Sequence, residues 1–166
     1  MADRRIKTPW DELTYRIIGC AMAVHRDKGP GYREDTYQRD LELQLAGAGL
    51  SFEPQKLLEV YDSLEHQVLV GYYVPDFVVA NQVVVEIKAL SALDNSHLAQ
   101  VIGYLAVTQC PVGLLLNFGL HSLQWKRILP PSKIATHQVN RRWLFVPDYL
   151  RRDEDGPPDP KPTANQ

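Results

Sequence analysis

Eight residues near the middle of the chain, Val83–Leu90 (VVVEIKAL), decide the fold. Their valines and isoleucine predict a strand, because branched side chains favour extended backbone. Side chains of a strand alternate between its two faces, so Glu86 and Lys88 share one face while Val85 and Ile87 enter the core. Taken alone, the two charged groups are most simply a surface ion pair on the wet face of an antiparallel strand, which contributes little to stability.

Asp76, which precedes Glu86 by ten residues, decides whether this face carries more than an ion pair. The strand that Asp76 opens is expected to fold back on the strand that holds Glu86. A three-residue turn at 80–82 places the two carboxylates opposite each other on one face, whereas a two-residue turn at 81–82 places Asp76 opposite Ile87. We expect the three-residue turn, or a bulge that restores the same pairing. Two carboxylates on one face repel each other, which favours a Mg²⁺ or Mn²⁺ ion held by oxygen ligands.

The remaining elements follow from the spacing of apolar residues and from the positions of Gly and Pro. Residues 112–117 are almost continuously apolar, which is typical of a strand buried on both faces. The order of helices and strands indicates an α/β or α+β domain, with a mixed central sheet flanked by helices. The predicted helices are 10–27, 33–48 and 94–109, and the predicted strands are 57–61, 67–73, 76–80, 83–89, 112–117 and 123–129.

Length and composition indicate one globular domain, since the 166 residues are 45% hydrophobic and 23% charged. We assign residues 1–150 to this domain, with a core at about 10–130, and expect the Pro- and Asp-rich residues 151–166 to form a disordered tail. No apolar run approaches the ~18 residues of a membrane span, and the first residues lack the apolar stretch of a secretory signal. Two widely separated cysteines fit reduced thiols, so a cytoplasmic location is expected.

The formal net charge of −2 hides an uneven distribution along the chain. Residues 126–152 hold seven basic side chains against one acidic side chain, Asp148. Binding of a polyanion depends on such local charge, although a solvated surface explains the stretch equally well. The candidate nucleic-acid contacts in this stretch are Lys126, Arg127, Arg141 and Arg142.

Two motifs, taken together, carry a resemblance to a known family. Pro75-Asp76, followed by Glu86-Ile87-Lys88, resembles the signature of the PD-(D/E)XK nucleases. Residues 31–37 (GYREDTY) match the GxxExxY motif that names one branch of that superfamily, and the later Asn117-Phe118 also matches the branch. The first pattern alone is loose, but the two motifs in this order are much more specific. The resemblance covers about residues 10–130.

The resemblance implies a restriction-endonuclease-like core and a role for each matching residue. Asp76 and Glu86 would hold the metal ion, with the Ile87 carbonyl completing its shell. Lys88 would act on the nucleophilic water, and Glu34 would add a carboxylate to the metal site. A simpler reading of Glu34 is also open, since acidic residues near a helix N-terminus are favoured by the helix dipole alone.

Gln100 and Tyr104 match the Q-x3-Y motif that RecB-like and related nucleases place after the lysine. Residues four apart share one face of a helix, so both side chains would point the same way. They could equally cap the edge of the sheet. Among the histidines, His97 is a candidate phosphate contact, and His25 is expected to make a local hydrogen bond.

These observations together predict a nuclease dependent on Mg²⁺ or Mn²⁺ that acts on nucleic acid, with DNA favoured over RNA. A homodimer, or a partner protein that supplies specificity, would fit the absence of a recognisable specificity domain, and no membrane partner is expected. Two alternatives stay open. The fold could be kept by a nucleic-acid-binding or regulatory module that no longer cuts, or the carboxylates could belong to a glycosidase.

Overall fold

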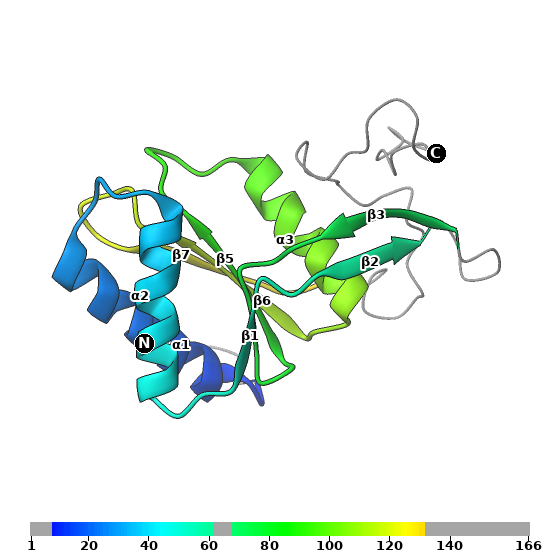
Figure 1. The fold of residues 1–166 in the computed structure, drawn as a ribbon, viewed down its shortest axis with the longest axis horizontal. Coiled ribbons are helices and arrows are strands. Elements are labelled where there is room, and N and C mark those ends of the chain that lie inside the picture. Colours follow the sequence, from blue (N-terminus) through cyan, green and yellow to red (C-terminus); the bar gives the residue numbers. More distant parts are fainter. Residues whose placement is uncertain (1–7, 62–67, 132–166) are drawn as a thin grey trace, which may run out of the picture.

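The computed structural model describes residues 8–61 and 68–131, drawn in colour in Figure 1. The predicted tail, residues 151–166, and the candidate contacts Arg141 and Arg142 lie outside the described residues. The helices are α1 (Asp11–Lys28), α2 (Glu34–Gly47) and α3 (Asn95–Thr108). The strands are β1 (Phe52–Pro54), β2 (Leu58–Tyr61), β3 (Leu69–Tyr73), β4 (Phe77–Val79), β5 (Val83–Lys88), β6 (Val112–Asn117) and β7 (Gln124–Ile128).

Five strands form one mixed sheet in the order β1-β4-β5-β6-β7. Its two central strands, β5 and β6, run parallel and are joined through α3, while the other neighbouring pairs are antiparallel. Strands β2 and β3 form a separate hairpin that extends away from the sheet (Figure 1). The predicted mixed sheet flanked by helices is thereby confirmed.

The helices cover both faces of the sheet, because β5 and β6 are apolar on both sides. α1 and α2 pack on one face, against a core that contains Val85 and Ile87 of β5. α3 packs on the other face, against a second core that contains Val84 and Leu115 and also receives the β2–β3 hairpin. Figure 1 shows α1 and α2 together on one side and α3 on the other. The face of β5 that carries Glu86 is therefore covered by α3.

The turn between β4 and β5 has the length that the sequence argument required. Val79 pairs with Val83 and Phe77 pairs with Val85, so three residues, 80–82, form the turn. Ala80 and Asn81 have φ angles of 51° and 55°, in the left-handed region that such tight turns use. The prediction of an odd-length turn is confirmed, and the register carries Asp76 to a position opposite Glu86.

One strand was missed by the sequence prediction. Strand β1 contains three residues, ends in Pro54, and pairs with β4 at one edge of the sheet. A segment this short shows no alternation of its own, and proline is tolerated in a strand chiefly at an edge. Its position depends on pairing with a strand more than twenty residues later in the chain.

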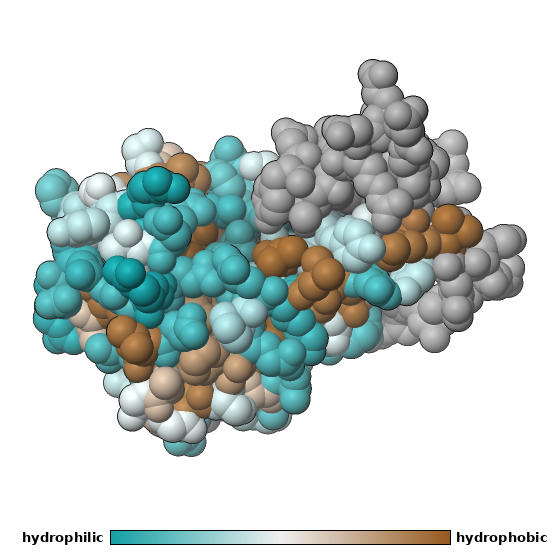
Figure 2. All heavy atoms as spheres, in the orientation of Figure 1, coloured by the Kyte–Doolittle hydropathy of each residue, from teal (hydrophilic) through white to brown (hydrophobic). Residues whose placement is uncertain are grey.

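The surface seen in Figure 2 is mostly hydrophilic, with apolar groups gathered over the β2–β3 hairpin. Leu57 and Val68, which directly precede β2 and β3, are 61% and 46% exposed. Among the helices in residues 8–61 and 68–131, none combines the length and apolar character needed to traverse a lipid bilayer.

Candidate active site

The ion pair on β5 is buried, so the simplest reading of the sequence was wrong. The Nζ atom of Lys88 lies 3.1 Å from Oε1 of Glu86, and the side chains are 14% and 6% exposed. The pair is buried because α3 covers this face of the sheet, which would otherwise be exposed to solvent. Removing two charges from water costs free energy that their attraction often fails to recover. A buried pair of this kind therefore points to a role beyond stability.

A second carboxylate reaches the same point from the preceding strand. Asp76 lies just before β4, and its Oδ2 accepts a 2.7 Å hydrogen bond from the backbone amide of Ile87. That amide is in β5, between the residues of the ion pair, so the bond fixes Asp76 against the strand that holds them. The main chain of Ile87 contributes here through its N–H group.

The two carboxylates oppose each other's ionisation. The pKa of Asp76 is raised to about 6, chiefly by burial and also by the charge of Glu34, against the opposing effects of the Ile87 amide and Lys88. Burial also raises the pKa of Glu86 well above its ordinary value, and the charge of Asp76 is the next cause. The charges of Glu34 and Lys88 affect the pKa values of both Asp76 and Glu86, which requires that all four side chains lie close together.

Glu34 joins the group from the first residue of α2. Its Oε1 accepts a 3.3 Å hydrogen bond from the backbone amide of Ala89, the residue that follows β5. The N-terminus of α2 and the carboxyl end of β5 therefore meet. The structure brings Glu34, Asp76, Glu86 and Lys88 together, although the first and last are more than fifty residues apart.

The tyrosine at the end of the segment 31–37 positions Glu34 indirectly. The hydroxyl of Tyr37 donates a 2.5 Å hydrogen bond to the carbonyl oxygen of Gly29 and accepts one of 3.2 Å from the amide of Tyr32. Its buried ring stacks on Phe118, with centroids 4.6 Å apart and an interplanar angle of 17°. The loop before α2 is thus tied to the segment after β6, which sets where the helix begins.

Asn117, at the end of β6, has a supporting role that we had not assigned from the sequence. Its side chain is fully buried and binds both backbone groups of Leu90, accepting from the amide and donating to the carbonyl at 2.9 Å. The next amide, that of Phe118, donates to the carbonyl oxygen of Lys88 at 2.8 Å. These bonds fix the chain directly after Lys88. The available signal was a polar residue closing an otherwise apolar strand.

The donor set fits a hard divalent cation. Oε2 of Glu86 is buried and has no hydrogen-bond partner among the residues that the structure describes, which is costly for a carboxylate oxygen unless a ligand binds it. Carboxylate oxygens are the ligands that Mg²⁺ and Mn²⁺ prefer. Across the described ranges 8–61 and 68–131, no three His, Cys, Asp or Glu side chains are already arranged around a common metal position. One oxygen of Glu86 instead faces Lys88, as described above.

Gln100 and Tyr104 lie beside this group, in the core under α3. Nε2 of Gln100 donates a 2.8 Å hydrogen bond to the hydroxyl of Tyr104, and both side chains are buried. The ring of Tyr104 meets that of Tyr73 edge-on, at 5.4 Å between centroids. Within the described part of the chain, Gln100 makes no hydrogen bond to Glu86.

The two basic candidates on β7 point to opposite faces. Lys126 pairs with Leu115, which pairs with Glu86, so Lys126 projects from the same face of the sheet as that carboxylate. Arg127 projects from the other face, where its NH1 atom lies 2.5 Å from a carboxylate oxygen of Asp11. Of these two residues, Lys126 is the one placed toward the buried carboxylates.

The two histidines have structural contacts. Nδ1 of His97 accepts a 2.9 Å hydrogen bond from the amide of Asp94, as part of the cap of α3. Nε2 of His25 lies 2.7 Å from the carbonyl oxygen of Leu120, which is 95 residues later in the chain. The expectation of a local hydrogen bond was therefore wrong.

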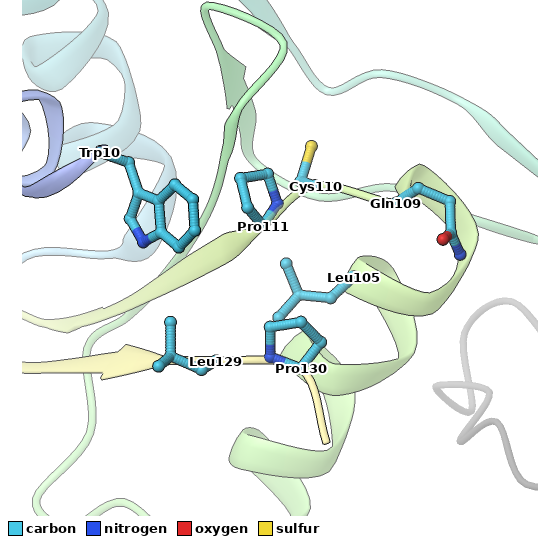
Figure 3. A pocket seen from close by; sticks show the side chains of 7 residues that line it. All are labelled: Trp10, Leu105, Gln109, Cys110, Pro111, Leu129 and Pro130. Atoms are coloured by element: carbon cyan, nitrogen blue, oxygen red, sulfur yellow. The ribbon is translucent and has the colours of Figure 1, made fainter. Parts of the chain in front are cut away.

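Two hollows on the surface differ in chemistry. A cleft of about 580 Å³ opens beside the carboxylates and includes Glu34 and Asp76 in its walls. A second pocket, of about 360 Å³, lies beyond the C-terminal end of α3 and is mostly apolar. Figure 3 shows the residues that line it, which are Trp10, Leu105, Gln109, Cys110, Pro111, Leu129 and Pro130. This pocket holds no carboxylate, so the chemistry expected from the sequence belongs to the first cleft.

Comparisons with known proteins agree with this geometry. Residues 11–128 match the family described as the PD-(D/E)XK nuclease superfamily, and this range includes all four converging residues. A solved structure described as the crystal structure of SSO0001 superposes with a TM-score of 0.50 at 21% sequence identity. The match covers 61% of this chain and 53% of that one, so this chain spans about half of SSO0001. No curated protein matches the sequence. The fold is restriction-endonuclease-like, and the chain belongs to the PD-(D/E)XK nuclease superfamily.

Proposed function

We propose that this protein is a nuclease that hydrolyses phosphodiester bonds of nucleic acid and requires Mg²⁺ or Mn²⁺. The observation that carries the proposal is the convergence of Asp76, Glu86 and Lys88 at the end of β5, where one buried carboxylate oxygen has no partner within residues 8–61 and 68–131. The GxxExxY segment supports a place in that branch of the superfamily, because its glutamate reaches the same point.

The carboxylates are the groups that would hold the cation. Asp76 and Glu86 would bind it directly, with Glu34 and the Ile87 carbonyl as further oxygen donors. When bound, the cation would supply positive charge to the scissile phosphate and would lower the pKa of a coordinated water. Its charge would also oppose the burial and the repulsion that raise the pKa values of the two carboxyl groups.

Lys88 acts as a hydrogen-bond donor and a positive charge. Burial is the largest single effect and acts to lower its pKa, but the charge and hydrogen bond of Glu86, together with the charges of Glu34 and Asp76, raise the pKa above the ordinary value. The amine therefore keeps its proton at neutral pH and is not a general base in this state. An ammonium group here can orient the attacking water and stabilise the charge that develops on the phosphate oxygens.

The residues around the carboxylates would support the site or contact the substrate. Gln100 and Tyr104 hydrogen-bond to each other on the helix that covers Glu86. They would maintain the buried surroundings that make the electrostatic effects strong. Lys126 is exposed on the same face of the sheet as Glu86 and would contact a phosphate farther along the bound nucleic-acid strand. The family resemblance favours DNA over RNA as substrate.

The test is cleavage of labelled single- and double-stranded DNA and RNA with Mg²⁺, Mn²⁺ or a chelator. We expect cleavage only with a cation, and Lys88→Ala should lower its rate by about 100-fold or more, as loss of a charge-stabilising donor does elsewhere. Lys56→Ala is a matched control, because its Nζ atom lies 3.0 Å from Oε1 of Glu53 in an exposed pair. Wild-type rates in the Lys88→Ala variant would contradict the assignment, and binding without cleavage would favour the inactive module instead.

A further inference from the structure

The cleft beside the carboxylates is lined by groups of mixed chemistry. Its volume of about 580 Å³ lies within the range of sites that take small ligands, and is of the order of a single nucleotide rather than a duplex. Its walls hold three carboxylates, from Glu34, Asp35 and Asp76. They also offer an aromatic ring, a guanidinium group and two amides, from Tyr32, Arg33, Gln38 and Gln55.

Tyr32 is exposed but held in place. Its side chain is 50% exposed, while its backbone amide donates to the hydroxyl of Tyr37 at 3.2 Å. The two rings meet edge-on, at 6.1 Å between centroids and 89° between planes. Nζ of Lys28 lies over the ring at 5.6 Å, which places a positive charge beside it. A half-exposed ring fixed on a buried one is suited to stack against a nucleic-acid base.

The two glutamines supply donors and acceptors across the cleft. Nε2 of Gln55 lies 3.4 Å from Oε1 of Gln38, a long contact that a ligand can replace at little cost. Gln55 has a φ angle of 45°, which a residue with a side chain seldom adopts. Its backbone N–H donates a 2.9 Å hydrogen bond to the carbonyl oxygen of Asp76. This backbone hydrogen bond holds the residue that carries the side-chain amide beside Asp76.

Arg33 is available for a phosphate. Its side chain is 88% exposed and is paired at 3.7 Å with Asp35, which is itself 70% exposed. Such exposed pairs contribute little, so the guanidinium can exchange Asp35 for a phosphate group.

We propose that this cleft binds one unpaired nucleotide next to the scissile phosphate. The base would stack on Tyr32, its edge would meet Gln38 and Gln55, and a neighbouring phosphate would meet Arg33. In a continuous duplex the faces of a base are covered by its neighbours, so the nucleotide must be unstacked to enter. The proposal rests on the nuclease function proposed above, and it assigns single strands, flaps or frayed ends as the preferred substrate class.

Binding can be measured without cleavage. Fluorescence anisotropy in chelator, with a labelled single-stranded oligonucleotide and a blunt duplex of the same sequence, separates the two substrate classes. We expect Tyr32→Ala to weaken single-strand binding by about 5- to 50-fold, the range found when a stacking aromatic is removed, and to change duplex binding much less. Tyr32→Trp should retain binding. Tyr15→Ala is the matched control, because this tyrosine is 78% exposed on α1 and does not line the cleft.

Kinetics with Mg²⁺ give a second readout. Tyr32→Ala should raise KM for single strands and leave kcat within a few fold, because Tyr32 binds the substrate away from the reacting atoms. Unchanged single-strand binding in Tyr32→Ala, or an equal loss for both substrates, overturns the subsite even if the wild-type protein cleaves. Selective loss of single-strand binding in a protein that never cleaves would support the subsite and overturn the nuclease.

Discussion

At the scale of single residues, burial determines what the carboxylates do. Asp76 ionises near pH 3.8 in the unfolded chain, but its pKa in the folded protein is about 6, chiefly because it is buried. Between these two values the folded state binds a proton that the unfolded state has lost. The contribution of this group to the stability of the metal-free protein is therefore fully present below about pH 4 and is lost as the pH rises toward about 6.

We expect Asp76→Asn to stabilise the metal-free protein at about pH 8 by about 1 to 3 kcal/mol, and to have little effect at about pH 4. The amide removes the charge whose burial is costly, and its oxygen can still accept the hydrogen bond from the Ile87 amide. Urea unfolding in chelator at several pH values measures the difference.

Asp35→Asn is the control for this experiment, because that carboxylate is 70% exposed and weakly paired. It should change the free energy of unfolding by no more than a few tenths of a kcal/mol at either pH. A gain for Asp76→Asn that is equal at both pH values would show that burial of charge is not its cause.

Residue-level predictions from the sequence succeeded where geometry is local. The pairing of Asp76 with Glu86 depends on the length of one turn, and the turn was predicted correctly. The burial of Glu86 could not be predicted, because it depends on α3, which follows β5 in the chain and folds back over it. The contact between Glu34 and the Ala89 amide likewise joins segments whose approach no local pattern encodes.

At the scale of elements, most helices and strands began and ended within a residue or two of their predicted bounds. Their apolar spacing is strong because each element buries a whole face or a whole strand. The exception, β1, has no such pattern, and its formation depends on its partner β4. The interaction between the ends of β5 and β6 also escaped prediction, although it fixes the chain that follows Lys88.

Gly119 makes that interaction testable. A Cβ atom at this position would lie 2.3 Å from the carbonyl oxygen of Leu90, so the backbone would have to move. We expect Gly119→Ala to lower stability by about 2 kcal/mol or more, as overpacking does, and to lower the cleavage rate by displacing Lys88. Thermal unfolding and a cleavage assay on the same samples measure both effects.

Gly19 provides the contrasting substitution. It lies in α1, and a Cβ atom there would meet nothing within 4 Å. Gly19→Ala should therefore stabilise the protein by about 0.5 to 1 kcal/mol, through helix propensity, and leave cleavage unchanged. If Gly119→Ala behaved like Gly19→Ala, the close approach of residues 90 and 119 would not constrain the site.

At the scale of the whole molecule, the site lies where two layers meet. α2 comes from the helical layer on one face, and the buried ion pair points toward the layer on the other. The fold class followed from the order of elements in the sequence, since alternating patterns of this kind give few stable layer arrangements. The order of strands in the sheet did not follow, because it depends on contacts between distant segments.

The stability of the entire domain should respond to the cation that the site is proposed to bind. An ion that binds only the folded state raises the free energy of unfolding, by about 1.4 kcal/mol at ten times its dissociation constant. For a domain of this size such a gain corresponds to about 3 to 6 °C in Tm. We expect this rise on addition of Mg²⁺ at about pH 8, and a smaller rise at about pH 5, where protons compete for the carboxylates.

The effect of Asp76→Asn on stability should depend on the cation in this experiment. In chelator it stabilises the protein by removing a buried charge, whereas with Mg²⁺ it removes a ligand and loses most of the rise in Tm. The two melting curves of the variant should therefore nearly coincide, while those of the wild type separate. Thermal melts at matched ionic strength, with NaCl replacing MgCl₂, exclude a general salt effect. The same Mg²⁺-dependent rise in wild type and variant would place the ion elsewhere, and Asp76 would then be a buried charge without a cation to offset its cost.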